Sequence, residues 1–217
     1  MRRIKNLLCL GMIGLASLLP TKSIAEVNIS SDINFLSRYM FFGIPFSKES
    51  VNQSMINLNK GDFTGILWEN YDAEQKKVNE IDVFADYTKS VKNKLKVSLG
   101  VIYFRAKVGN NWEDCIDWYA GACATDIPLS PSITCHKFTG SGSYVESGIL
   151  RDFPFSKKIT ATASGKLGYN DKAFREKTGF SHLETNLKIS VKLSKKLSVI
   201  PNINYSRALA DDLDNIT

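Results

Sequence analysis

Apolar and polar residues alternate along most of this sequence, and this alternation constrains the fold more than any other feature. It is clearest in residues 182–194, where the odd-numbered positions are aliphatic apart from one threonine, and every even-numbered position is polar. Successive side chains of a β-strand point to opposite faces, so the pattern predicts a strand with one apolar and one water-facing side. No segment shows a sustained helical period. The sequence therefore predicts an all-β fold.

The same reasoning predicts eleven strands in all. Besides 182–194, alternation is clear in residues 79–87, 94–103, 159–169 and 197–206, and weaker in 27–40, 51–59, 63–70, 116–127, 132–138 and 143–153. A pattern of apolar, polar, basic and apolar positions recurs between strands at 91–95, 155–159 and 193–197. Such short polar connections are typical of β-hairpins. We therefore expect an antiparallel, up-and-down arrangement.

Long and short connections alternate between the predicted strands. The long ones lie near 43–50, 71–78, 105–114, 170–181 and 207–217, and the short ones at 60–62, 90–93, 128–130, 154–156 and 195–196, with 139–142 as the exception. Outer-membrane barrels have short turns on the periplasmic side and longer loops outside. The connections therefore favour an antiparallel up-and-down transmembrane β-barrel, with a soluble β-sandwich as the alternative fold.

The first 25 residues have the layout of a secretory signal peptide. Arg2 and Arg3 precede an apolar stretch at 7–19, and the small residues Ser23 and Ala25 end the segment. We therefore expect a signal peptide at 1–25, an outer-membrane barrel domain at 26–217, and export to the cell outer membrane. An uncleaved N-terminal anchor is the alternative, but the apolar stretch is short for a spanning helix.

The net charge of the chain is +6, but much of it belongs to the predicted signal peptide. Arg2, Arg3, Lys5 and Lys22 lie there, with no acidic residue. Without them the charge is +2, because 24 basic and 22 acidic residues remain. A nucleic-acid-binding domain needs clustered basic residues. The composition therefore argues against a nucleic-acid partner.

Three cysteines, Cys115, Cys123 and Cys135, follow the predicted signal peptide. Their spacing matches no zinc or haem signature. Cys123 and Cys135 flank the predicted turn at 128–130, so a cross-strand disulfide is the alternative. The faces predicted for these two residues differ, however, and cross-strand disulfides are often strained. We expect three free thiols.

Catalytic chemistry has little support in the sequence. The two histidines, His136 and His182, belong to no His-x-x-x-His or Cys-x-x-Cys motif. A barrel enzyme needs a nucleophile with a base in reach, and a serine–histidine pair is the alternative that the serine-rich strands leave open. We expect the histidines to be wall residues near the rim. No catalytic residue, cofactor site or metal site is predicted, and the protein is not expected to be an enzyme.

Charged residues on the polar faces of two strands are the candidate lumen-lining residues. Glu80, Asp82 and Asp86 lie on the fourth predicted strand, and Lys188 and Lys192 lie on the tenth. In a ring of twelve strands, the fourth and tenth are opposite each other. An acidic wall facing a basic wall would favour small polar or zwitterionic solutes over strong ion selectivity.

Several short motifs, in order, resemble those of TorF-type porins, a group of outer-membrane β-barrels. Ser37-Arg38-Tyr39-Met40-Phe41-Phe42-Gly43 is similar to their S-x-Y-x-x-x-G opening, and further similar stretches lie at 65–70, 79–82, 100–103, 129–134, 167–170, 179–182 and 201–205. The sequence departs from the family at Cys135-His136, where aromatic residues are expected, and at the C-terminus. The resemblance implies a barrel and no established chemistry.

Together these features predict a porin-like outer-membrane barrel that lets small polar solutes pass, with outer-membrane lipid around it. The first alternative is a barrel with a filled lumen, which has a structural role or binds a ligand or partner through its external loops. A barrel enzyme is the second alternative.

The predicted strand number is odd, although bacterial single-chain barrels have an even number of strands. The strand at 197–206 would run outward, and no alternating strand ending in an aromatic residue follows it. We therefore expect about twelve strands in the complete form, with the last one missing here through C-terminal truncation, or else a miscount near 39–59 or 139–142. The strand at 27–40 would then lack a partner on one side.

Overall fold

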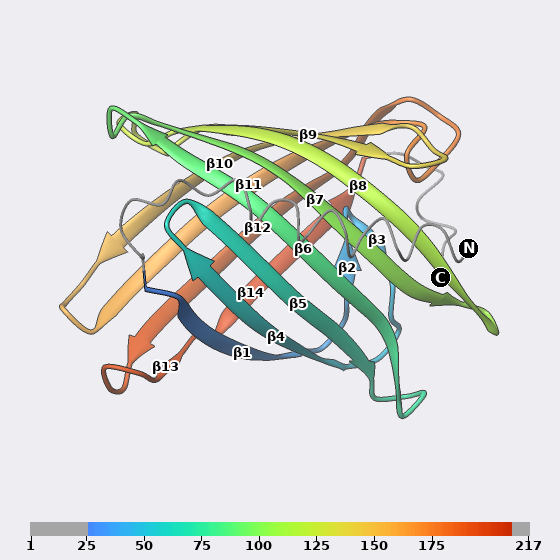
Figure 1. The fold of residues 1–217 in the computed structure, drawn as a ribbon, viewed down its shortest axis with the longest axis horizontal. Helices are drawn as coiled ribbons and strands as arrows, with labels where there is room; N and C mark the ends of the chain where they lie inside the picture. The colour runs from blue at the N-terminus through green and yellow to red at the C-terminus, as the bar shows by residue number, and fades with distance from the viewer. Residues whose placement is uncertain (1–25, 210–217) are drawn as a thin grey trace.

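The computed structural model describes residues 26–209, and most of them belong to one antiparallel sheet that curls around an interior (Figure 1). The predicted signal peptide at 1–25 and residues 210–217 lie outside the described residues. The strands are β1 (Asn28–Leu36), β4 (Val51–Lys60), β5 (Phe63–Asp72), β6 (Lys77–Val91), β7 (Leu95–Val108), β8 (Asn111–Ala124), β9 (Ser132–Phe138), β10 (Ser143–Pro154), β11 (Ile159–Asp171), β12 (Gly179–Lys192), β13 (Ser198–Val199) and β14 (Asn202–Ala208).

Neighbouring strands of the sheet pair in chain order, β1 with β4 and then each with the next up to β12. The predicted strand at 197–206 is divided into β13 and β14, which both pair with β12. Pro201 lies at the division, because proline has no N–H group to donate to the sheet. The prediction of an all-β, antiparallel, up-and-down fold is confirmed.

The described residues do not close the sheet into a barrel. β1 pairs only with β4, and β14 pairs only with β12. The curl nevertheless brings the two edges toward each other, because residues 29–31 of β1 and the turn at 193–197 line one space of about 1010 Å³. The first strand thus lacks a second partner among the described residues, while the predicted truncation stays a prediction.

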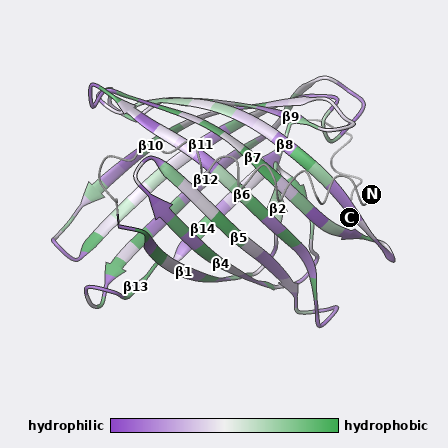
Figure 2. Cartoon of the chain, viewed as in Figure 1, coloured by the Kyte–Doolittle hydropathy of each residue, from purple (hydrophilic) through white to green (hydrophobic). Residues whose placement is uncertain are grey.

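The two faces of the sheet differ in hydropathy. Residues opposite each other on antiparallel strands share a face, which places Leu67, Val83 and Tyr103 on one face and Trp68, Asp82 and Phe104 on the other. The outer face carries exposed apolar side chains on many strands, among them Ile29, Ile56, Leu67, Leu99, Trp118, Ile133, Ile149, Leu187 and Ile203. The alternation is visible along the strands in Figure 2. The inner face carries most of the fully buried polar side chains.

The connections do not alternate in length as the sequence predicted. A long loop was expected near 105–114, but β7 and β8 continue to a tight turn at residues 109–110. Arg105 lies across from Asp114 and over the Trp112 ring, so polar and aromatic pairs support this hairpin where the apolar alternation ends. Conversely, the predicted short turn at 128–130 is part of a longer connection at 125–131.

A second, two-stranded sheet is the main feature that the sequence did not predict. It consists of β2 (Met40–Phe41) and β3 (Ile44–Pro45), within the connection between β1 and β4. Figure 1 shows it within the outline of the curled sheet. Residues 39–46 are called the inner hairpin below.

Candidate functional site

The inner hairpin turns at Phe42 and Gly43, which both have positive φ angles, 48° and 80°. Two such residues between paired strands match the tight turn that suits a two-residue β-hairpin. The Phe46 N–H donates to the Tyr39 carbonyl (2.8 Å), and the Tyr39 N–H donates to Ser47 Oγ (2.8 Å). Glycine adopts this backbone freely, whereas a bulky residue such as Phe42 does so only under strain. Contacts of the Phe42 ring must therefore hold the turn in place.

The residues of the inner hairpin contact side chains around most of the interior. Tyr39 lies against Trp68 of β5 (ring centroids 5.7 Å apart), and Phe41 lies against Phe104 of β7 (5.5 Å). The Phe42 ring contacts His136 of β9 (5.2 Å) and Tyr144 of β10 (4.4 Å). On the far side, Gly43 abuts His182 of β12, because a Cβ atom at position 43 would overlap the His182 ring. The inner hairpin therefore spans the interior from β5 to β12.

The connection between β11 and β12 closes over the same aromatic group. Phe174 stacks on Phe42 (5.1 Å between centroids, 24° between planes) and contacts Phe138 (4.8 Å). Buried Asn170 fixes this connection, since its Oδ1 accepts the N–H groups of Ala173 (3.2 Å) and Phe174 (2.9 Å). Its Nδ2 donates to the carbonyls of residues 175 and 177. The sequence therefore positions Phe174 through a single buried amide.

Both histidines lie in this region, each with a polar partner. His136 Nδ1 is 2.6 Å from Asp117 Oδ2, and Asp117 is fully buried. His182 Nδ1 lies 3.2 Å from the Tyr144 hydroxyl and 3.1 Å from Ser181 Oγ. The aspartate thus pairs with one histidine and the serine with the other. The described residues do not combine the three groups into one serine–histidine–aspartate site.

Two of the predicted lumen residues, Glu80 and Asp82, are buried beneath the inner hairpin. Their exposed fractions are 5% and 2%. The Tyr39 hydroxyl lies near the Glu80 carboxylate and interacts with it. Burial, with the nearby charges of Glu80 and Asp82, raises the pKa of Tyr39 above its usual value, so the hydroxyl stays protonated and donates. Asp82 Oδ1 is buried and has no hydrogen-bond partner among the described residues.

The third acid, Asp86, is fully engaged by the protein. Its carboxylate accepts from the Tyr119 hydroxyl (2.8 Å) and from Thr88 Oγ1 (2.7 Å). Gly100 leaves the room that the Tyr119 side chain needs, because a Cβ atom there would overlap the phenol ring. Asp86 therefore differs from Glu80 and Asp82, although all three share one face of β6.

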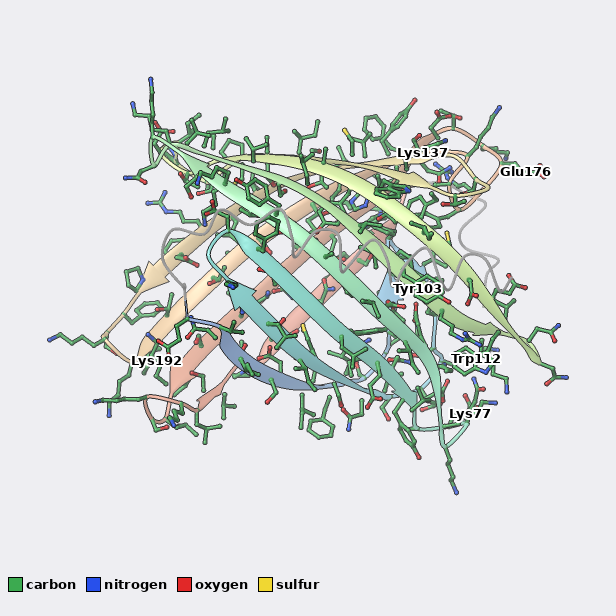
Figure 3. All side chains as sticks on the ribbon, in the orientation of Figure 1. Lys77, Tyr103, Trp112, Lys137, Glu176 and Lys192 are labelled. Atoms are coloured by element: carbon green, nitrogen blue, oxygen red, sulfur yellow. The ribbon has the colours of Figure 1, made fainter. Side chains whose placement is uncertain are left out.

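Lys188 and Lys192 are exposed on β12, away from the inner hairpin. Lys192 lines the space between β1 and the 193–197 turn. Figure 3 shows Lys192 and Lys77 at opposite ends of the sheet. The structure thus does not bring the lysines together with the buried acids, and a lumen with opposed charged walls stays a prediction.

The three cysteines are free within residues 26–209. The alternative, a disulfide between Cys123 and Cys135, does not form, because Cys123 is opposite Ser132 and Cys135 is opposite Ala120 in the sheet register. No three or more histidine, cysteine, aspartate or glutamate side chains in this range are placed to hold a metal ion. Nor does any helix in it have the length and apolarity to cross a membrane.

No protein-family model, curated protein or solved structure matches the chain. The resemblance of residues 37–43 to TorF-type porins therefore stays a prediction.

Proposed function

We propose that this chain forms the wall of an outer-membrane β-barrel, and that small polar solutes pass through it only when the inner hairpin leaves its place. The observation that carries this proposal is the span of the inner hairpin, which contacts the wall from Trp68 on β5 to His182 on β12.

The hydropathy of the two faces supports a membrane location. Exposed apolar side chains such as Leu99, Trp118 and Ile203 recur on the outer face, and each would be unfavourable in water at about 25 cal/mol per Å². A hydrocarbon environment removes that cost and suits an apolar-out, polar-in strand pattern. Backbone groups in lipid must be paired, so the proposal requires partners for the free edges of β1 and β14 in the membrane.

The construction of the inner hairpin supports a gate rather than a permanently open pore. Phe42 holds a strained backbone through contacts with Tyr144, His136 and Phe174. These contacts stabilise the strained backbone. When they are lost, the strain favours release of the hairpin, so the proposed gate has a closed arrangement and a released one. The sheet itself need not change, because within the described residues β2 and β3 pair with each other and with no strand of the large sheet.

Phe42→Asn tests the proposal in planar lipid bilayers. Asparagine followed by glycine retains the preferred sequence of this turn, while the aromatic contacts are lost. We expect low conductance from the wild type and a large increase from the variant. The matched control is Phe46→Asn in the same hairpin, because Phe46 is exposed and contacts only Tyr39 and Phe41 among the aromatic rings.

The conductance of the three proteins decides between the functions. A wild type that conducts as well as Phe42→Asn would show an open pore. If neither the wild type nor Phe42→Asn gives a current, while heat-modifiable gel mobility shows that both are folded, the gate is overturned. That result would favour a barrel with a permanently filled interior.

A further inference from the structure

Glu80 and Asp82 are two neighbouring carboxylates in a buried part of the interior. They are two residues apart on one face of β6, which separates their Cα atoms by about 7 Å. Both are more than nine-tenths buried. Burial of an ionised carboxylate is costly unless a cation or several donors compensate. The residues around the pair therefore decide what it can bind.

No cationic side chain compensates the pair among residues 26–209. Across the sheet, Glu80 is opposite Asn70 and Ala106, and Asp82 is opposite Trp68 and Phe104. None of the salt bridges in this range includes either acid. The nearby Arg105 side chain is on the other face of the sheet, paired with Asp114.

Among residues 26–209, Tyr39 is the side chain whose hydroxyl interacts with the pair. Its hydroxyl interacts with the Glu80 carboxylate, and its ring centroid lies 5.7 Å from that of Trp68. Asp82 Oδ1 has no hydrogen-bond partner within the described part of the chain. Tyr39 therefore satisfies part of the site and covers Trp68, and it supplies no charge.

An alkylammonium group matches what is missing. It brings a positive charge and N–H donors that can reach two carboxylates, and its cation is attracted to the face of a tryptophan ring. A metal ion fits less well, since the described residues provide no third acidic, histidine or cysteine ligand here. We propose that Glu80, Asp82 and Trp68 form a subsite for the alkylammonium group of a solute, which Tyr39 covers while the inner hairpin is closed.

This inference rests on the proposed function and names the class of solute that the gate admits. A cation that binds Glu80 and Asp82 competes with the Tyr39 hydroxyl. A ligand shifts a two-state equilibrium toward the state that binds it more tightly. Alkylammonium solutes therefore favour release of the inner hairpin.

Isothermal titration of the folded full-length protein in detergent micelles tests the subsite. The probe is butylammonium chloride at constant ionic strength, with butanol as the neutral analogue and potassium chloride as the inorganic one. We expect binding of butylammonium alone. Glu80→Gln and Asp82→Asn should each weaken it about tenfold or more, as loss of a hydrogen bond to a charged group does.

Two further variants sharpen the test. Asp86→Asn is the matched control, because Asp86 is an acid on the same strand and face whose oxygens already have protein donors, and it should bind butylammonium like the wild type. Tyr39→Phe removes the competing hydroxyl and should bind more tightly. Circular dichroism verifies the β-sheet content of every variant.

Several outcomes would overturn the proposal. These are equal binding of butanol or potassium, unchanged affinity in Glu80→Gln and Asp82→Asn, or absence of binding in both the wild type and Tyr39→Phe. The measurement uses neither a membrane nor a current. Failure of the subsite is therefore distinguishable from failure of the gate, which the conductance of Phe42→Asn decides.

Discussion

The interior of the curled sheet differs between the region around the inner hairpin and the region around Lys192. Around the hairpin, side chains such as Tyr144, His182 and Asn170 are almost completely buried and most have hydrogen-bond partners. Near Lys192, the residues that line the space between β1 and the last hairpin turn are exposed, and four of them are lysines. The comparison shows that a short segment, rather than the sheet itself, fills one part of the interior and leaves the part near Lys192 exposed.

A substitution at Gly43 should have the largest effect on the close packing around the inner hairpin. Gly43→Ala places a methyl group into the His182 ring and forces a side chain onto a positive φ angle. The strain alone costs about 1–2 kcal/mol, and the overlap adds to it. We expect displacement of the inner hairpin, measured as rapid chymotrypsin cleavage after Phe41 or Phe42 in otherwise folded protein.

Gly61→Ala is the control for this substitution. Gly61 also has a positive φ angle, 60°, but no atom of residues 26–209 outside its immediate neighbours lies within 4 Å of the position of an added Cβ. It should therefore show the backbone strain without the overlap, and leave the inner hairpin protected. Equal cleavage of the two variants would mean that contact with His182 does not hold the hairpin.

Asn170 provides the next largest expected effect. Asn170→Ala removes four hydrogen bonds to the connection between β11 and β12. Each contributes about 1 kcal/mol to the free energy of unfolding, so the upper limit of the loss is roughly 4 kcal/mol. The amides of Ala173 and Phe174 lose their acceptor. We expect their hydrogen exchange to accelerate strongly, followed by loss of the Phe174 contact with Phe42.

Asn186→Ala is the matched change on β12, four residues along the strand from His182. Asn186 is also on the inner face, but its Oδ1 has no hydrogen-bond partner among the described residues. Its removal should alter the free energy of unfolding by no more than about 0.5 kcal/mol and leave the Ala173 and Phe174 amides unchanged. A comparable acceleration in both variants would indicate that the hydrogen bonds of Asn170 do not specifically hold the connection between β11 and β12.

The strands were predictable from the sequence because alternation is a direct consequence of a sheet with unlike faces. The inner hairpin was not, because residues 39–46 are mostly apolar and do not alternate. All of them except Phe46 are at least partly buried, so no water-facing side imposes a period. Phe42-Gly43 between apolar residues was the one available signal of a tight turn.

The candidate site was predictable only in part, for a related reason. Glu80 and Asp82 were identified because they share the polar face of an alternating strand, but their burial depends on Tyr39, which is distant in the sequence. Asn170 and Asp117 were missed because a single buried amide or carboxylate has no repeating pattern. Their roles follow from partners that only the fold brings together.

The cysteines give the smallest effect and the finest comparison between the two regions. Cys115 is half-buried on the inner face and packs against the aromatic cluster around Phe104 and Phe138, whereas Cys123 lies on the same face near the 125–131 connection. A water-soluble maleimide should therefore label Cys115 faster in Phe42→Asn than in the wild type, while the labelling of Cys123 stays the same. Peptide mass spectrometry reads each site separately. If both rates rise together, release of the inner hairpin loosens the sheet as well, and the interior does not open locally at all.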